Sequence, residues 1–480
     1  MSRTIIGRQQ ERQFLNKIIV SDKPEFVVVL GRRRVGKTYL IYEHLREQIV
    51  FAFSGAYEVP SKTQLGHFFT EYLRLTQAQQ HTIPPADWNM AFAYLTDYLN
   101  GLKPAAGQKA VVFLDELPWL DTPKSGFVAA LEYFWNQHVS KMNHVALIAC
   151  GSVASWMGKN LLRSKGGLYN RVTATLHLQP FTLAETAEFC SQKQLKLSPY
   201  QMVQLYMAMG GIPFYLNALT PGKSVVQLID EICFSSTGLL AQEYENMYFS
   251  LFKNAANHMA IIEALAKHPY GMIRNALLNA TGLPSGTFAR SLEDLLESGF
   301  LIKLQPFQKK EKDSLYRLID MYSLFYLRFI KGNAGRAGIS WQLLSAESSY
   351  ATWCGYAYEN ICLLHIKQVL KKLGISGILT NASSWYFKGN DELPGTQIDL
   401  LIDRKDGLIN LCEVKFSAND FILTKEYAAQ LRRKISVFEA VTQTKKAVVT
   451  TLITTYPAVQ NTHYLEHIQS EITMDDLFAE

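Results

Sequence analysis

Residues 26–38 combine an apolar run with a glycine-containing loop of a type that holds phosphate groups. Phe26–Leu30 is typical of a buried strand, a Gly-x-x-x-x-Gly-Lys-Thr segment follows, and the apolar pattern then continues as a helix opening. Strand, loop and helix in this order are the context of a phosphate-binding loop (P-loop), whose backbone N–H groups and helix N-terminus face an anion. We expect Lys37 to reach the β- and γ-phosphates of ATP and Thr38 to hold Mg²⁺. The residues expected to line this nucleotide site are Gly31, Arg32, Arg33, Arg34, Val35, Gly36, Lys37, Thr38 and Tyr39.

A pair of carboxylates follows a second apolar run, Ala110–Leu114. Asp115 at the tip of this predicted strand can bind Mg²⁺ directly or through water. Glu116 beside it can polarise the attacking water as a general base. The alternative is an ordinary loop start, which the upstream P-loop disfavours. Asp115 is therefore a predicted metal ligand, and Glu116 and Lys37 are predicted catalytic residues.

Two further residues are candidates to respond to the γ-phosphate. Ser152 ends the apolar run that begins at His144, where it could act as a sensor or equally as the N-cap of a following helix. Arg171 precedes another predicted strand and could act as an arginine finger, or it could be a surface or salt-bridge residue. Both alternatives stay open at this stage.

The predicted strands alternate with helical stretches, which favours a parallel, doubly wound sheet. We therefore expect an α/β fold built on a P-loop NTPase parallel sheet with a helical subdomain. A chain of 480 residues is too long for one hydrophobic core, so two to four domains are expected.

These motifs together resemble a known family. The resemblance is to the archaeal-type ATPases of the signal-transducing (STAND) branch of the AAA-related NTPases, and it covers roughly residues 1–235. It implies that Gly7 and Arg8 help form the adenine pocket and that Gly211 and Pro213 contact the nucleotide. Asn170 stands where family members often have glycine, before Arg171. The segments that carry the resemblance are Ile6–Arg8 with Glu11, the P-loop, Leu114–Glu116, Tyr169–Arg171, Pro180–Phe181 and Gly210–Pro213.

Residues 250–320 have the pattern of a winged-helix domain. Three helical patterns, the third starting near Ser285, precede a predicted hairpin around the charged loop Lys309–Lys312. The third helix could enter a DNA major groove while the wing lysines meet phosphates. An internal lid or a protein contact is the alternative, because Glu293 and Glu297 place acid on the same helix. Residues 321–345 are expected to form a helical connector.

Residues 346–480 contain a second chemical constellation. Two predicted strands joined at an Asp-Gly turn carry Asp399 on one strand and Glu413 and Lys415 on the other. Period-2 alternation places Glu413 and Lys415 on one face, where buried charges are costly unless they bind something. Asp399 and Glu413 would hold Mg²⁺, and Lys415 would orient or deprotonate water in phosphodiester hydrolysis.

This Asp-x₁₃-Glu-x-Lys spacing resembles the restriction-endonuclease-like nuclease fold, and also the C-terminal domain often fused to ATPases of this type. The resemblance implies that Glu359, on a preceding helix, joins the metal ligands, and that Gln430 and Lys434 occupy the later polar positions. Two alternatives stay open: a solvent-facing strand with chance charges, and an intact fold whose site does not cleave. We expect an α/β nuclease-like C-terminal domain.

Composition restricts the partners. The formal charge of +6 permits nucleic acid without demanding it. Six cysteines without a Cys-x-x-Cys pair disfavour zinc and disulfides, and no apolar run is long enough for a membrane span. The N-terminus has no signal-peptide h-region, so we expect a cytoplasmic protein that binds ATP and Mg²⁺ and contacts DNA but no membrane. A homo-oligomer is left open, since Arg171 would act on a neighbouring subunit only if subunits assemble.

The leading hypothesis is an ATPase that couples its nucleotide state to a nucleic-acid-binding or metal-dependent nuclease-like C-terminal domain. The alternative is a nucleotide-dependent signalling switch whose C-terminal domains bind a partner or DNA without cleavage. A DNA-binding transcription regulator ranks last because the net charge is modest.

Overall fold

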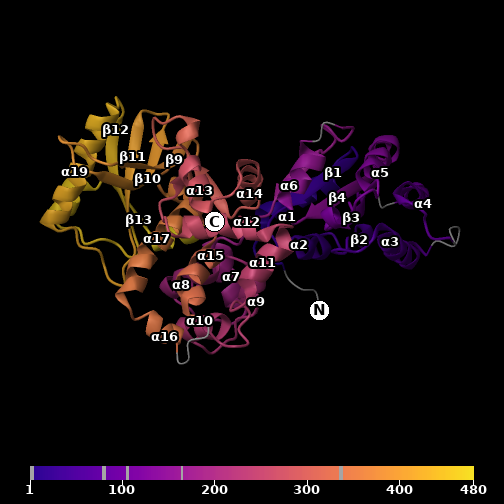
Figure 1. Ribbon diagram of the computed structural model, residues 1–480, viewed down its shortest axis with the longest axis horizontal. Coiled ribbons are helices and arrows are strands. Elements are labelled where there is room, and N and C mark those ends of the chain that lie inside the picture. The colour runs from indigo at the N-terminus through magenta and orange to yellow at the C-terminus, as the bar shows by residue number, and fades with distance from the viewer. Residues whose placement is uncertain (1–4, 78–82, 104–106, 164–165, 334–338, 480) are drawn as a thin grey trace. The chain divides into compact units, whose positions relative to one another are not determined.

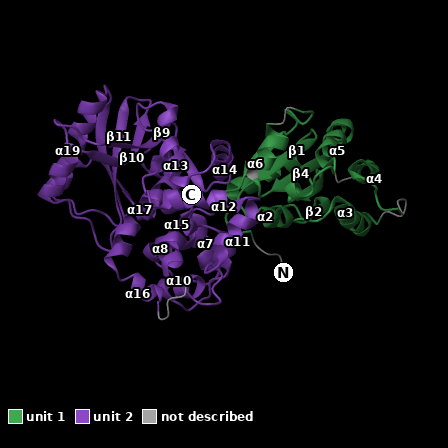
Figure 2. Ribbon diagram, in the orientation of Figure 1, with its two compact units in different colours: residues 1–180 green, residues 181–480 purple. Residues whose placement is uncertain are grey.

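The fold comes from a computed structural model that describes residues 5–77, 83–103, 107–163, 166–333 and 339–479. The chain divides into two compact units, residues 1–180 and residues 181–480, which Figure 2 colours separately. The four domains expected from the sequence, with bounds at 1–235, 250–320, 321–345 and 346–480, stay a prediction.

The first unit is built on a parallel sheet with strand order β2-β3-β4-β1-β5. This confirms the predicted α/β fold with a P-loop NTPase sheet. Figure 1 shows the sheet among its helices. The strands are β1 (Glu25–Leu30), β2 (Ile49–Ser54), β3 (Ala110–Asp115), β4 (Val145–Gly151) and β5 (Ala174–His177). The helices are α1 (Gln9–Ile19), α2 (Lys37–His44), α3 (Ser61–Thr76), α4 (Trp88–Gly101), α5 (Phe127–Tyr133) and α6 (Ala154–Met157).

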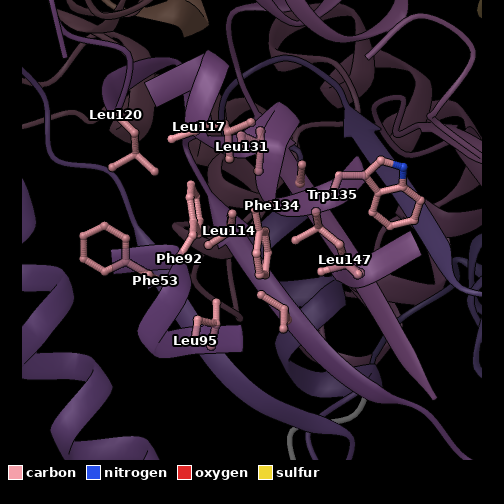
Figure 3. Packing of buried hydrophobic residues seen from close by; sticks show 14 of the residues in the cluster. Phe53, Phe92, Leu95, Leu114, Leu117, Leu120, Leu131, Phe134, Trp135 and Leu147 are labelled. Atoms are coloured by element: carbon pink, nitrogen blue, oxygen red, sulfur yellow. The ribbon is translucent and has the colours of Figure 1, made fainter. Parts of the chain in front are cut away.

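The core of this unit lies where the sheet meets helices α3, α4 and α5. Strands β1, β3 and β4 are buried along their whole length, as expected for a parallel sheet covered on both faces. Phe92 of α4 stacks on Phe134 with ring centroids 4.7 Å apart. Figure 3 labels both rings within the core. This packing holds the carboxyl ends of β1, β3 and β4 in a fixed relation, and these ends carry the predicted nucleotide-site residues.

The second unit begins with helices and a small three-stranded sheet of order β6-β8-β7. Its first helices are α7 (Leu183–Gln192), α8 (Pro199–Met209), α9 (Pro213–Asn217), α10 (Val225–Cys233) and α11 (Glu243–Leu251). There follow α12 (Ala255–Ala266), β6 (Met272–Ile273), α13 (Arg274–Thr281), α14 (Ser285–Glu297), β7 (Leu301–Leu304) and β8 (Leu315–Leu318). Strand β8 pairs antiparallel with both β6 and β7, so a helix, a strand, two helices and a hairpin follow one another.

A five-stranded mixed sheet of order β13-β12-β11-β10-β9 forms the rest of the second unit. Strands β9, β10 and β11 pair antiparallel, whereas β12 and β13 join in parallel. The helices are α15 (Met321–Phe325), α16 (Trp341–Leu344), α17 (Ser348–Leu364), α18 (Ile366–Lys372), α19 (Lys425–Thr442) and α20 (Thr462–His467). The strands are β9 (Thr380–Phe387), β10 (Thr396–Arg404), β11 (Leu408–Lys415), β12 (Ala447–Thr454) and β13 (Ser470–Thr473). In the described part of the chain, every helix is too short or too polar to cross a bilayer.

Candidate functional site

The P-loop connects β1 to α2, and its two glycines adopt backbone conformations that suit no other residue. Gly31 has φ of 154°, and a Cβ there would lie 2.4 Å from the carbonyl oxygen of Leu178. Gly36 has φ of 91° and occupies the N-cap of α2. Because only glycine reaches such angles without strain, the loop curls tightly and the N-terminus of α2 opens toward it.

Lys37, the first residue of α2, folds back over this loop. Its side chain is only 5% exposed, and its ammonium group donates to the carbonyl oxygens of Gly31 (2.8 Å) and Arg32 (3.0 Å) and to the hydroxyl of Ser152 (3.0 Å). An ammonium group has three donors, so two are satisfied by the loop and the third by Ser152 after β4. The cation predicted to meet phosphates is therefore held where the loop curls.

Thr38 and Asp115 form an oxygen pair beside the loop. The Thr38 hydroxyl donates to Asp115 Oδ2 at 2.8 Å, and the backbone N–H of Glu116 donates to Asp115 Oδ1 at 3.0 Å. Ser54 donates to the same Asp115 Oδ2 at 3.3 Å. Sequence inspection missed Ser54, although it is the polar residue that ends β2 and lies directly opposite Asp115 in the β2–β3 ladder. Hydroxyl and carboxylate oxygens are the ligand type that Mg²⁺ prefers.

Ser152, at the carboxyl end of β4, links the ammonium group of Lys37 to the carboxylate of Glu116. Its hydroxyl accepts from Lys37 and donates to Glu116 Oε1 at 2.7 Å, and its backbone N–H donates to Glu116 Oε2 at 3.3 Å. Glu116 has φ of 45°, an uncommon conformation for a residue with a Cβ. Such backbone outliers cluster at functional sites, where surrounding contacts impose them.

Arg8 brings the N-terminal Gly-Arg pair against the P-loop. Its guanidinium group donates to the carbonyl oxygen of Val35 at 3.2 Å and pairs with Glu11 at 3.4 Å. Arg8 itself has φ of 57° and precedes α1. The structure thus places Arg8 beside the loop, and Gly7 adjoins it in the chain.

The remaining predicted nucleotide-site residues differ in their surroundings. Arg32 is buried, whereas Arg33 and Arg171 are exposed and Tyr39 is 40% exposed. Gly211 and Pro213 belong to the second unit, so their predicted contact with the nucleotide stays a prediction. A Cβ at Gly211 would lie 2.0 Å from the carbonyl oxygen of Phe181. This close approach of the backbone explains why glycine occupies position 211, whether or not it contacts a nucleotide.

A second cluster of charged side chains lies on the β10–β11 hairpin of the second unit. The β9–β10 pairing shifts register between Ile398 and Leu401, so a bulge falls at Asp399. Bulges re-aim side chains and recur next to active sites. Leu400 pairs with Cys412 in the β10–β11 ladder, which puts Asp399 and Glu413 next to each other on adjacent strands.

Glu413 is 1% exposed and is surrounded by donors. Lys415 lies 2.9 Å from Oε1, Lys434 lies 2.7 Å from Oε2, and the Tyr427 hydroxyl also donates to Oε1. Burial alone would raise the pKa of Glu413, but Lys415 and Lys434 outweigh it and hold this pKa below its ordinary value. Glu413 is therefore a buried, ionised carboxylate that is paired with two lysine side chains of the same chain.

Asp399 and Glu359 are carboxyl groups with raised pKa values. Burial and then the charge of Glu413 raise the pKa of Asp399, whose Oδ1 accepts from Gln397 at 3.1 Å. Burial and then Asp399 raise the pKa of Glu359 to about 8, against the opposing effect of Arg317, which pairs with it at 3.1 Å. The negative charges of these carboxyl groups therefore act on one another, and a bound cation would relieve that repulsion.

Sequence inspection found most of this cluster but missed Tyr427 and Arg317. Tyr427 carried a usable signal, because it precedes Lys434 by seven residues on α19 and so lies on the same helical face. Arg317 carried none, because it comes from β8, far from the hairpin in sequence. Within the described ranges, no group of three or more His, Cys, Asp or Glu side chains is arranged to hold a metal ion. Metal binding by Glu359, Asp399 and Glu413 stays a prediction.

Part of the chain matches a known family. Residues 6–219 match a family model described as an ATPase domain predominantly from Archaea. This match supports an ATPase domain of the archaeal type in this part of the chain, in agreement with its P-loop.

The whole chain has relatives at low identity. It is 25% identical over 396 residues to an uncharacterised protein of Methanocaldococcus jannaschii, covering 80% of this chain and 82% of that protein. Among solved structures, a Walker-type ATPase of Pyrococcus abyssi is similar at 16% identity with a TM-score of 0.49, covering 68% of this chain and 96% of that one. The ORC2 protein of Aeropyrum pernix is similar at 14% identity with a TM-score of 0.42, covering 68% and 94%.

Proposed function

We propose that the first unit binds ATP with Mg²⁺ and hydrolyses it. The observation that carries this proposal is the bridge from Lys37 through Ser152 to Glu116, beside the Thr38–Asp115 pair. Ser152 is thus within hydrogen-bonding distance of both the proposed phosphate-binding cation, Lys37, and the proposed general base, Glu116. The archaeal-type ATPase domain over residues 6–219 supports the same function.

The residues present fit both parts of the ligand. Thr38 and Asp115 offer oxygen donors for Mg²⁺, which when bound neutralises charge on the phosphates. Lys37 exchanges its carbonyl partners for phosphate oxygens, and the N–H groups of residues 31–38 face the same anion. Gly7 and Arg8 serve the adenine side, and Arg171 is a candidate arginine finger.

Glu116 takes a proton from the attacking water as the general base. Each carboxylate oxygen accepts one hydrogen bond from Ser152 and keeps a further lone pair for the attacking water. Ser152, which also contacts Lys37, transmits the state of the phosphate side to the base. Hydrolysis thereby depends on occupancy of the loop.

We further propose that the ATPase is coupled to a metal-dependent, nuclease-like site in the second unit. Asp399, Glu413 and Glu359 would hold Mg²⁺, and Lys415 would orient the attacking water. The order α12, β6, α13, α14, β7 and β8 fits a winged helix, whose third helix α14 would contact DNA. The placement of Asp399 and Glu413 opposite each other on β10 and β11, beside the register shift between β9 and β10, supports a cation site.

The test measures ATP hydrolysis and DNA cleavage on the same full-length preparations. Lys37→Ala is expected to abolish nucleotide binding, and Glu116→Gln to retain binding but lose turnover. Lys62→Ala, an exposed lysine of α3, is the matched control. Normal hydrolysis by Lys37→Ala would refute the P-loop assignment.

For the second site, plasmid and linear DNA are incubated with Mg²⁺ or Mn²⁺, with and without ATP. Asp399→Asn is expected to lose cleavage, whereas Asp403→Asn on the same strand, which pairs with Lys446, is expected to retain it. Cleavage that is equal in both variants would refute the nuclease assignment.

A second candidate function is a nucleotide-dependent switch that binds a partner or DNA without cutting. The observation that favours it is that both Glu413 carboxylate oxygens, and Glu359, are already paired with cations of the chain itself. ATP hydrolysis with DNA binding but without cleavage in the assay above is the outcome this candidate predicts.

A further inference from the structure

A cavity of about 570 Å³ lies inside the second unit, apart from the groups discussed above. Its walls come from the end of α12 with residues 267–269, from residues 324–331, and from one face of α17, with Leu318 of β8 at its base. Figure 1 locates α12 and α17. A volume of this size is within the range of pockets that enclose a small organic ligand.

The rim of this cavity is cationic. Lys267, Arg328 and Lys331 line it, and Glu263 is the one acidic side chain among the described residues of the lining. Lys331 is neutralised by Glu263 at 2.7 Å. Within the described residues, neither Lys267 nor Arg328 is paired with a carboxylate, so two exposed cations remain. Two unpaired cations at a cavity mouth favour an anionic ligand group.

Asn360, one of the residues that line the cavity, has a buried side-chain acceptor that is unsatisfied. Asn360 of α17 is 3% exposed, and its Nδ2 donates to the carbonyl oxygen of Leu318 at 3.2 Å. Its Oδ1 has no hydrogen-bond partner among the described residues. Since the assignment of the two amide atoms follows from the Leu318 contact, the free atom is an acceptor that requires an N–H or O–H donor.

Aromatic and aliphatic side chains also line the cavity. Trp353 and Tyr356 of α17 line the cavity together with Leu324 and Leu327. Trp353 is held by edge-on contacts with Phe325 and Phe329, with ring centroids 5.7 Å and 5.2 Å apart. A fixed aromatic wall of this kind suits a flat ring.

We propose that this cavity binds a nucleoside monophosphate, as a second nucleotide site that does not involve the P-loop. The base lies against Trp353 and Tyr356 and donates an N–H to Asn360 Oδ1, and the phosphate is held by Lys267 and Arg328. All of these residues belong to the second unit, so the proposal is independent of the ATPase and nuclease assignments. Both a free nucleotide and the terminal nucleotide of a nucleic-acid strand carry the base and the phosphate group that this cavity would bind.

The test uses the full-length Lys37→Ala variant, in which nucleotide binding at the P-loop is expected to be disabled. Isothermal titration calorimetry measures the binding of AMP, GMP, inorganic phosphate and a five-nucleotide single strand to this variant. Saturable binding of AMP or GMP is expected, and inorganic phosphate should bind at least tenfold more weakly. Adding Lys267→Gln or Arg328→Gln should weaken nucleotide binding by about tenfold each, as for the loss of one charge-assisted hydrogen bond. Lys405→Gln, an exposed lysine in the β10–β11 turn, should change nothing.

Asn360→Leu tests the buried acceptor and should weaken nucleotide binding without altering the already weak binding of phosphate. Circular dichroism shows whether this buried variant folds, while the two exposed rim variants keep the test decisive if it does not. Tighter binding of the strand than of AMP, lost in the same variants, would identify a strand end as the natural source. Absence of nucleotide binding, equal binding of inorganic phosphate, or full affinity in both rim variants would overturn the proposal.

Discussion

Ser152 holds the carboxylate of Glu116 with two hydrogen bonds, one from its hydroxyl to Oε1 and one from its backbone N–H to Oε2. The same hydroxyl accepts from the ammonium group of Lys37. A single small side chain at the end of β4 therefore touches both the cation and the base of the proposed reaction. A helix N-cap would satisfy only local backbone donors and would not need these contacts.

Ser152→Ala removes the hydroxyl that orients Glu116 but leaves the P-loop intact. We expect kcat for ATP hydrolysis to fall by about tenfold, with the nucleotide Kd changed by less than about threefold, because a lost orienting hydrogen bond acts on the reacting base. Steady-state kinetics and equilibrium nucleotide binding measure the two quantities. Ser152→Thr, which keeps a hydroxyl, should recover most of the rate. An unchanged kcat in Ser152→Ala would show that the bridge is only structural.

Gly31→Ala should destabilise the first unit. The new Cβ would lie 2.4 Å from the Leu178 carbonyl oxygen, and alanine is strained at φ of 154°. The unfolding free energy should fall by about 2 kcal/mol or more. Denaturant unfolding followed by circular dichroism measures this change. Gly66→Ala, inside α3 with no atom within 4 Å of the new Cβ, is the control and should be neutral or stabilising by up to about 1 kcal/mol. Equal stability of the two variants would contradict the steric argument.

Lys434 and Glu413 should show strong energetic coupling. Lys434→Met leaves the buried Glu413 with one cation fewer, so we expect the free energy of unfolding to fall by about 2–3 kcal/mol. Glu413→Gln alone should also lower the free energy of unfolding. The double variant should lose less than the sum of the two, with an interaction energy of about 1–3 kcal/mol in a double-mutant cycle. Lys425→Met, exposed at the start of the same helix, serves as the control. Simple additivity of the two single losses would argue against the pairing.

His365 should make the second unit less stable in mild acid. Its Nε2 accepts from the backbone N–H of Leu183 at 2.9 Å, so its proton lies on Nδ1, which donates to the Ile361 carbonyl oxygen at 2.9 Å. Burial lowers the pKa of His365 from 6.5 to about 4. The folded state thus binds fewer protons than the unfolded state between these values. Its contribution to stability is complete above pH 6.5 and is lost as the pH falls toward 4.

The slope of this loss is at most about 1.4 kcal/mol per pH unit. Denaturant unfolding at a series of pH values measures it. His365→Gln, which cannot titrate, should be less stable at neutral pH but should show a shallower dependence between pH 6.5 and 4. An identical pH profile in the variant would mean that other groups cause the acid sensitivity.

Local sequence determined the P-loop and the strand tips. The backbone angles of Gly31 and Gly36 and the position of the Lys37 side chain depend on residues that are adjacent in the chain. The spacing of these three residues in the sequence was therefore enough to predict the loop. Asp115 and Ser152 could be placed because the carboxyl ends of parallel strands meet at one edge of a sheet. Alternation along the hairpin likewise placed Glu413 and Lys415 on one face.

Tertiary structure alone decided which groups satisfy one another. The contact of Arg317 with Glu359 joins β8 to α17, and the bulge at Asp399 arises from its pairing with β9. Ser54 meets Asp115 only because β2 and β3 are neighbours in the sheet. The unsatisfied oxygen of Asn360 becomes visible only once three separate helical segments enclose it. Such partners come from distant segments, and their separation in the chain carries no periodic signal because packing, not local backbone geometry, brings them together.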